Sequence, residues 1–121
     1  MNFIEMESAQ KLRGGYYTPL DIATFIVRWV KEISPKRILE PSCGDGVFFD
    51  ALAKVEGFQK TEMVGFELNA DEAAKAYARS CDVGLKTVQV YHDDFLEWAI
   101  NHLNDGNTQF DAVVGNPPFV R

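Results

Sequence analysis

Four consecutive residues near the end of the chain have the types and order needed for chemistry on the amino group of an aromatic ring. They are Asn116-Pro117-Pro118-Phe119. Two successive prolines restrict the backbone and have no N–H to donate, so the Pro117 carbonyl is left free. This carbonyl oxygen and the amide oxygen of Asn116 are together two acceptors for the two hydrogens of such an amino group. Such a pair favours a tetrahedral nitrogen whose lone pair faces an incoming methyl group, and Phe119 offers a face for stacking. The alternative is a strand-terminating turn.

A second candidate site is the turn from Glu40 to Gly46, with the sequence Glu-Pro-Ser-Cys-Gly-Asp-Gly. Gly44 and Gly46 allow positive φ and a close approach of the backbone to a ligand. A plain turn between strand and helix is one alternative, and a dinucleotide site such as that for NAD is another. The dinucleotide pattern expects a small residue where Phe49 stands, and the acid Glu40 suits a cation better than a phosphate. The turn therefore favours a cofactor with ammonium and sulfonium groups.

Acidic residues also follow the next two segments that read as strands. Glu67 lies roughly 20 residues after the glycine turn, where an acid can accept hydrogen bonds from ribose hydroxyls. A solvent-facing strand end is the alternative there. In the run from His92 to Phe95, an Asp can accept from an adenine amino group, and the following N–H can meet a ring nitrogen. Because Asp also caps helices, Asp93 could be only the cap of the next helix.

Apolar periodicity around these segments predicts an α/β chain in which strands alternate with helices. Such chains form right-handed crossovers around a parallel sheet, and ligands bind beyond the carboxyl ends of the strands. The residues singled out above all fall at those ends. We expect strands at 37–40, 62–68, 86–91 and 110–114, and helices at 19–33, 47–55, 70–80 and 95–103.

The starts and faces of two helices can also be predicted. Thr18 is expected to be the N-cap of the first helix, with Pro19 at its first position and Asp21 closing a capping box. Asn69 is expected to cap the third helix, with Glu72 three residues further on. Trp29 and Trp98 are expected on core-facing helix surfaces. The first helix carries apolar residues at helical spacing, namely Ile22, Phe25, Ile26, Trp29, Val30 and Ile33.

The bulk composition argues against several classes of protein. The 121 residues suffice for one domain, no apolar run could span a bilayer, and the N-terminal residues lack a signal pattern, which favours the cytoplasm. A net charge of −6 is unlike a surface that grips nucleic-acid phosphates. Cys43 and Cys81 lack metal-binding spacing, so we expect free thiols and no zinc. His92 and His102 are expected to be surface or strand-end residues rather than bases.

In this order, the sites resemble those of class I S-adenosylmethionine-dependent methyltransferases, and more closely the gamma-class DNA adenine-N6 methyltransferases of restriction–modification systems. The segment Gly14-Gly15-Tyr16-Tyr17-Thr18-Pro19 strengthens this likeness, which covers nearly the whole chain. The resemblance implies a Rossmann-like parallel sheet whose first four strands lie in the order 3-2-1-4. It also implies that residues 1–121 are the N-terminal part of a catalytic domain, with an arm at 1–17 and the cofactor-binding half and catalytic loop at 18–121.

The resemblance assigns roles around S-adenosylmethionine as the cofactor. Thr18 at a helix start meets the methionine carboxylate, and Glu40 meets the amino group. Glu67 binds the ribose, and Asp94 with Phe95 binds the adenine. The implied cofactor contacts are Tyr17, Thr18, Glu40, Pro41, Gly44, Gly46, Glu67, Asp94, Phe95 and Asn116. The implied catalytic loop is Asn116, Pro117, Pro118 and Phe119, in which Phe119 stacks on the target base where the family more often has Tyr.

The implied partner is duplex DNA with a flipped adenine, held by regions that this chain lacks. On that interpretation the chain is a truncated piece that binds cofactor without turnover, and the open edge strand 110–114 could pair with a second copy. One alternative is methylation of RNA or of a protein glutamine, two reactions that use the same motif. Another is a non-catalytic cofactor-binding module. A dinucleotide-binding domain is a further alternative.

Overall fold

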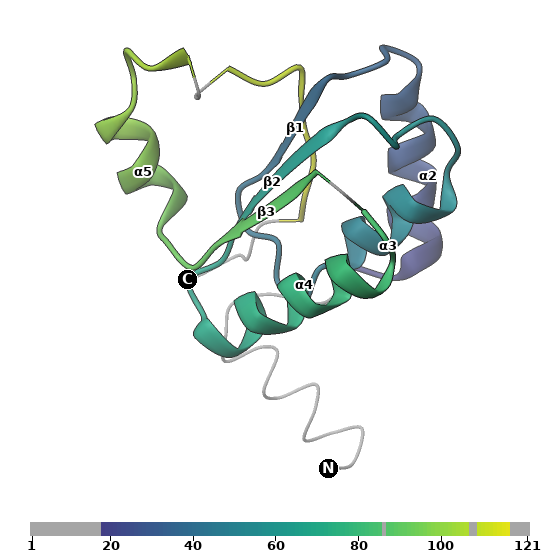
Figure 1. Ribbon diagram of the computed structural model, residues 1–121, viewed down its shortest axis with the longest axis horizontal. Helices are drawn as coiled ribbons and strands as arrows, with labels where there is room; N and C mark the ends of the chain where they lie inside the picture. Colours follow the sequence, from purple (N-terminus) through teal and green to yellow (C-terminus); the bar gives the residue numbers. More distant parts are fainter. Residues whose placement is uncertain (1–17, 86, 107–108, 117–121) are drawn as a thin grey trace.

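The computed structural model describes residues 18–85, 87–106 and 109–116, and it contains a four-stranded parallel sheet (Figure 1). The strands lie in the order β3-β2-β1-β4, as the resemblance implied. The strands are β1 (Arg37–Glu40), β2 (Glu62–Phe66), β3 (Val88–Tyr91) and β4 (Ala112–Val113). The helices are α2 (Leu20–Lys31), α3 (Val47–Lys54), α4 (Ala70–Asp82) and α5 (Phe95–Asn101). Alternation of strands and helices is therefore confirmed, although most of the elements are shorter than predicted.

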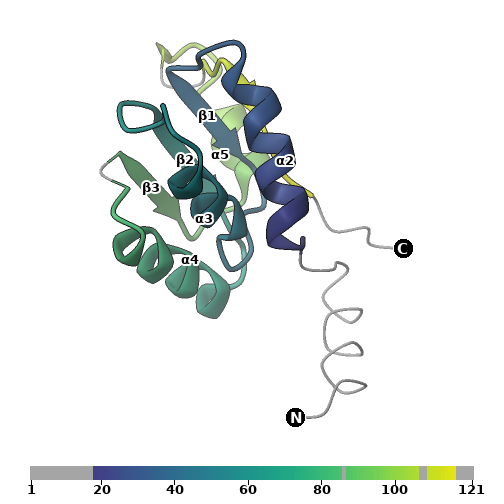
Figure 2. The ribbon, with the colours of Figure 1, turned by 90° about the vertical axis from the view of Figure 1, so that its right-hand side faces the viewer.

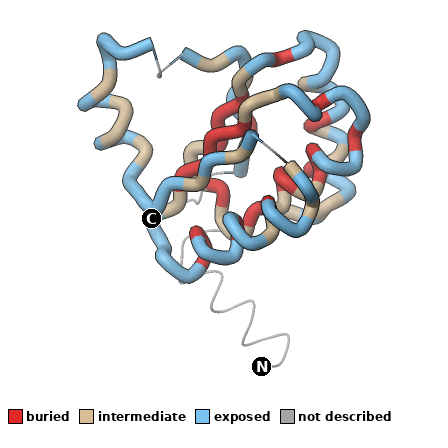
Figure 3. The backbone as a smooth tube through the Cα atoms, viewed as in Figure 1, coloured by how far each residue is buried: buried red, intermediate tan, exposed pale blue. Residues whose placement is uncertain are grey.

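Helices cover both faces of the sheet, because successive strand residues point to opposite sides. Ile38 and Met63 pack with α2, α3 and α4, whereas Leu39, Val64 and Phe66 form a second cluster. The second cluster includes Phe95 and Trp98 of α5 together with Phe110. Figures 1 and 2 show α5 alone on one face and the other helices on the opposite face. The buried segments lie mainly in β1 and β2 and in parts of α2, α3 and α4 (Figure 3).

Helix α3 packs very closely on β2 because Gly65 has no side chain. A Cβ added at Gly65 would lie 3.1 Å from Phe49 Cζ and 3.2 Å from Cys43 Sγ. Phe49 is completely buried at this contact. The large ring thus fills the contact between helix and strand, and its incompatibility with a dinucleotide turn stays a prediction.

The predicted capping of α2 is wrong by one residue. The N-cap is Pro19, with φ −60° and ψ 145°, and no side chain caps the helix. A proline ring fixes φ but leaves ψ free to be extended, so helical geometry begins only at Leu20. Asp21 Oδ1 instead accepts from the N–H of Ile22 at 2.9 Å, so neither Thr18 nor Asp21 takes part in a capping box.

The apolar stripe of α2 that includes Trp29 faces outward. Ile22, Phe25, Trp29 and Ile33 are 50 to 73% exposed. The helix instead buries the smaller Ala23 and Val27 against α3 and the sheet. Two adjacent stripes carry apolar residues, and periodicity alone does not choose between them. The core prediction is therefore wrong for Trp29, whereas Trp98 packs 4.9 Å from Phe66 between ring centroids.

Several absences are found within the described part of the chain. No helix there is long and apolar enough to cross a membrane. No group of His, Cys, Asp and Glu among those residues is arranged to hold a metal ion. Cys43 and Cys81 are both free thiols.

Candidate active site

The turn after β1 is fixed to the carboxyl end of β2 by backbone and side-chain hydrogen bonds. The N–H of Cys43 donates to the carbonyl of Phe66 at 2.8 Å. The N–H of Gly44 donates to Glu67 Oε1, and the N–H of Asn69 donates to Glu67 Oε2, both at 2.9 Å. Glu67 is only partly buried, so its carboxylate joins two strand ends while one side remains open to a ligand.

The two glycines of this turn have different surroundings. Gly44 has φ +55° and Gly46 has φ +94°, so both adopt the left-handed backbone that was predicted for them. A Cβ at Gly46 would lie 3.1 Å from Ala76 Cα, so this glycine lets α3 pack against α4. A Cβ at Gly44 would have no atom of the described residues within 4 Å, apart from its chain neighbours. Gly44 is therefore the glycine whose backbone remains open to a ligand.

Glu40 is a buried acid at the end of β1. Its residue is 2% exposed, and its Oε2 atom has no hydrogen-bond partner among the described residues. Burial raises the pKa of this carboxyl well above its usual range, and the nearby Asp45 and Glu67 raise it further. A buried carboxylate needs a cation or donors to be stable. An ammonium group placed beside Oε2 would satisfy both the atom and its charge.

An arginine from α4 organises the acids around the turn. Arg79 Nη1 lies 3.4 Å from Asp45 Oδ1, and Arg79 Nε lies 3.2 Å from Asp50 Oδ2. Burial raises the pKa of Asp50, and Arg79 opposes that shift. Burial also raises the pKa of the Cys43 thiol strongly, with Glu40 adding to the effect. Cys43 is therefore a protonated core residue and not a nucleophile.

Strand β4 brings the chain back to the carboxyl end of β1. Ile38 pairs with Ala112 and Leu39 with Val113, and the N–H of Val114 donates to the Leu39 carbonyl at 2.9 Å. A Cβ built on Gly115 would lie 3.5 Å from Glu40 Cγ. Asn116 is therefore delivered, exposed, beside the carboxyl end of β1. Tyr17, Pro117, Pro118 and Phe119, which were also predicted to act here, lie outside the described residues.

The remaining predicted residues lie at the starts of two helices, α5 and α2. Asp94, rather than Asp93, caps α5, since its Oδ1 accepts from the N–H of Leu96 at 3.0 Å. Phe95 packs edge-on against Phe66, 5.4 Å between ring centroids. The start of α2, next to Thr18, lies at the same end of the sheet as the carboxyl ends of the strands (Figure 2). The structure thus brings these predicted residues to the carboxyl ends of the strands, and their contacts with a cofactor stay a prediction.

Residues 3–121 match the sequence profile of the family described as N-6 DNA Methylase. The chain belongs to this family. The type II methyltransferase M.CvrRI of Paramecium bursaria Chlorella virus XZ-6E is 32% identical over 106 residues, which cover 88% of this chain and 24% of the viral protein. A tRNA1(Val) (adenine(37)-N6)-methyltransferase of Yersinia pestis strain Pestoides F is 28% identical over 95 residues, which cover 75% of this chain and 35% of that protein. The chain thus spans about a quarter of the viral relative and about a third of the Yersinia relative.

Solved structures place the fold among the class I S-adenosylmethionine-dependent methyltransferases. A modification subunit assigned to a type I restriction enzyme of Vibrio vulnificus YJ016 has a TM-score of 0.67 and 23% identity, and the match covers 95% of this chain and 26% of that one. The N-terminal domain of EvdMO1 with S-adenosylhomocysteine bound has a TM-score of 0.58 and 26% identity, covering 81% of this chain and 37% of that one. This chain has a truncated form of that Rossmann-like fold, with four strands in the order β3-β2-β1-β4.

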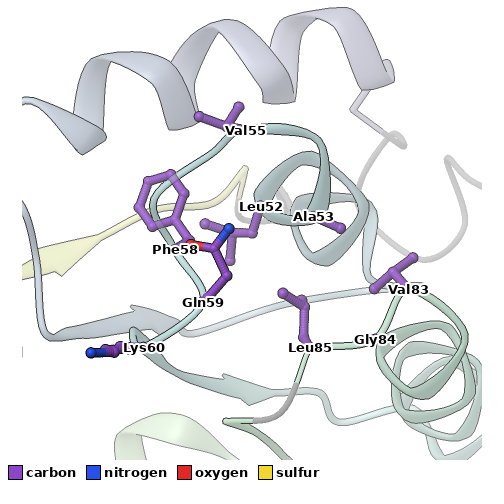
Figure 4. Close-up of a pocket in the computed structure, with 9 residues that line it drawn as sticks. All are labelled: Leu52, Ala53, Val55, Phe58, Gln59, Lys60, Val83, Gly84 and Leu85. Carbon is purple, nitrogen blue, oxygen red and sulfur yellow. The ribbon is translucent and has the colours of Figure 1, made fainter.

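Two features of this family member were missed in the sequence. Leu68 is 69% exposed directly after Glu67, and its carbonyl lies 2.9 Å from His92 Nε2. A pocket of about 450 Å³ lies at the opposite, amino-terminal edge of β2 and β3 (Figure 4). Its lining is mostly apolar and comprises Leu52, Ala53, Val55, Phe58, Gln59, Lys60, Val83, Gly84 and Leu85. No unusual residue pattern marks that pocket, because its side chains are those of ordinary core and loop positions.

Proposed function

We propose that this chain is the cofactor-binding and acceptor-presenting part of a DNA methyltransferase that transfers a methyl group from S-adenosylmethionine to adenine N6. The proposal includes membership of a restriction–modification system, which the viral and Vibrio relatives support by their descriptions. We also propose that it acts in the cytoplasm, where DNA and the cofactor meet. Residues 18–121 would form the functional half and residues 1–17 an arm.

The charges at the strand ends suit the cofactor better than they suit a dinucleotide. The orphaned Oε2 of Glu40 would accept from the ammonium group, and Pro41 lies next to that acid. The start of α2, with Thr18 and Tyr17, would receive the carboxylate, since free N–H groups there attract anions. Glu67 would accept from the ribose hydroxyls while it keeps the Gly44 turn in place.

The adenine of the cofactor would lie toward the loop after β3. Asp94 uses Oδ1 for the helix cap, and its second oxygen remains to accept from the adenine amino group. Phe95 would contribute its N–H, as its ring is held against Phe66. The cap therefore orients the acid for the ligand, so the two roles are compatible.

One observation supports the proposal: a Cβ built on Gly115 would lie 3.5 Å from Glu40 Cγ, so Asn116 follows beside the carboxyl end of β1, where we propose that the cofactor binds. The cofactor supplies an electrophilic methyl group on a sulfonium centre. Asn116 and the carbonyl of Pro117 would accept the two hydrogens of the adenine amino group and direct its lone pair at that carbon. Transfer would form the N–C bond as the C–S bond breaks, and the amino proton would leave afterwards. Pro118 would keep the loop rigid, and Phe119 would stack on the flipped base.

The grip on DNA would come from sequence that the longer relatives have and this chain does not. The net charge of −6 gives few phosphate contacts, and the chain spans 24% of M.CvrRI. We therefore propose that the 121 residues bind cofactor but do not turn over. Among the described residues, strand β4 is the outermost strand on its side of the sheet, with Val113 64% exposed. This edge would pair with a second copy when nothing else covers it.

The test is transfer of labelled methyl groups to duplex DNA, to tRNA and to a glutamine-containing peptide. It uses the 121-residue chain and the protein as its gene encodes it in full, each with an Asn116→Ala control. The proposal predicts N6-methyladenine in DNA with the full-length protein and none with Asn116→Ala. The tRNA methyltransferase among the relatives favours RNA as the second candidate. Label in tRNA or peptide and never in DNA would exclude DNA as the substrate.

A further inference from the structure

A histidine joins the loops that follow β2 and β3. The Nε2 atom of His92 lies 2.9 Å from the carbonyl oxygen of Leu68, 24 residues earlier in the chain. A carbonyl oxygen can only accept, so Nε2 must carry the hydrogen and donate it. The bond therefore fixes one ring orientation of His92 and ties its loop to the segment that directly follows Glu67.

This bond extends a series of links across three strand ends. The N–H of Gly44 bonds to Glu67, and Glu67 also accepts from the N–H of Asn69. The N–H of Glu67 donates to the carbonyl of Tyr91 at 3.0 Å, which joins β2 and β3 where the strands end. The His92 bond lies one residue further along both strands. It is thus a link between the two loops on the ligand side of the sheet.

We propose that His92 is a positioning residue for the adenosine half of the cofactor. It holds the exposed Leu68 segment at a fixed separation from Asp94, two residues after His92 itself. The apolar Leu68 side chain and the acid at the α5 cap then form two walls of one adenosine site. The inference rests on the proposed function, because it needs the cofactor to bind at this edge.

The position of the link predicts which part of a ligand is affected. Leu68 and Asp94 lie on the β2 and β3 side, whereas Glu40, the acceptor for the ammonium group, ends β1. Loss of the His92 donor should therefore weaken ligands through their adenosine part alone. S-adenosylhomocysteine and methylthioadenosine share that part, but methylthioadenosine lacks the amino-acid group. A defect at His92 should reduce the affinity of both ligands by the same factor.

The experiment measures both affinities calorimetrically for the 121-residue chain and three variants. His92→Ala should weaken each ligand about three- to tenfold, the range expected for one hydrogen bond. His92→Gln, which keeps an N–H donor, should recover most of the loss. His102→Ala is the matched control, since the ring of His102 bonds to the carbonyl of Trp98 in α5, the helix that His102 follows, and its affinities should equal those of the parent chain.

Distinct results separate the inference from the proposed function. Parent-like binding of both ligands by His92→Ala would overturn the positioning role and leave the proposed function standing. Weakened binding that His92→Gln does not recover, accompanied by a lower melting temperature, would also overturn it, because that result indicates a structural role. If the parent chain bound neither ligand, both proposals would fail. Equal losses for both ligands, recovered by Gln, support the role.

Discussion

The carboxylate of Glu67 accepts a hydrogen bond from the backbone N–H of Gly44 at 2.9 Å, so an acid from the end of β2 holds the turn after β1. The same carboxylate accepts from Asn69 at the start of α4. The turn, the carboxylate that we propose as the ribose acceptor and the next helix are therefore aligned before a ligand arrives. Preorganisation of this kind reduces the ordering cost of binding.

Glu67→Ala should weaken S-adenosylhomocysteine binding about 10- to 100-fold, because it removes the proposed ribose acceptor and releases the Gly44 turn. Glu62→Gln is the matched control: it changes a glutamate on the same strand that pairs with Arg37 at 3.0 Å, at the other end of the sheet. Its affinity should remain close to that of the parent chain. Calorimetric titration of the two variants makes the comparison. Similar affinities for the two would remove Glu67 from the site.

Cofactor binding should release a proton from Glu40. The pKa of this carboxyl is raised by burial and by the neighbouring acids, so the carboxyl is protonated in the free protein below its raised value. An ammonium group beside it lowers the pKa and favours ionisation. Calorimetry over a series of pH values, in buffers with different ionisation enthalpies, should show proton release for S-adenosylhomocysteine below the raised pKa of Glu40, and Glu40→Gln should abolish it. Equal release by Glu40→Gln would assign the proton to another group.

The same carboxyl should make stability depend on pH. Because the folded pKa of Glu40 lies above the unfolded value of about 4.3, the folded state binds the proton more tightly. The contribution of this proton to the free energy of unfolding is fully present below the unfolded pKa and is lost as pH rises through the folded pKa. At pH values above the folded pKa, the Glu40→Gln variant should therefore unfold at a higher denaturant concentration than the parent chain. A variant equally or less stable there would contradict the account.

Gly65→Ala should destabilise the chain by about 1–3 kcal/mol, because the new Cβ would press on Phe49 and Cys43 in a packed core. Neither neighbour is the free end of a flexible side chain. Gly106→Ala is the control, since a Cβ there would have no atom within 4 Å. Urea unfolding of the two variants gives the comparison. Equal midpoints would mean that α3 can move away from β2 at little cost.

Asp111 should anchor the strand that carries Asn116. Its Oδ2 accepts from the N–H groups of Lys36 and Arg37 at 2.7 and 3.0 Å. These bonds hold the pKa of Asp111 below its usual range, so the anchor is present above the unfolded pKa and is lost as pH falls through the folded value. Asp111→Ala should speed hydrogen exchange at Val114, which bonds to Leu39. Unchanged exchange at Val114 would show that β4 needs no such anchor.

The sequence was most informative where a local hydrogen bond or a backbone requirement decides the structure. Asn69 was predicted to cap α4, and its Oδ1 accepts from the N–H of Glu72 at 3.0 Å. The positive φ of Gly44 and Gly46 was likewise expected from their places in a tight turn. Each of these features depends on a few neighbouring residues.

Tertiary choices were not accessible in the same way. Periodicity did not reveal that α2 buries Ala23 and Val27 and leaves Trp29 exposed, because both stripes are apolar and packing selects between them. Strand order came from the family resemblance and not from the residues themselves. The link between His92 and Leu68 joins positions 24 residues apart, and the types of these two residues do not indicate that they meet.

The central claim is that Asn116 and Glu40 face one cofactor, and a crystal structure of the chain with S-adenosylhomocysteine tests it most directly. The account predicts the ligand's amino nitrogen at about 3 Å from Glu40 Oε2, its ribose hydroxyls on Glu67, and its sulfur turned toward the Asn116 amide. A ligand bound instead in the pocket lined by Phe58 and Leu85, or an Asn116 side chain directed away from the sulfur, would contradict the account.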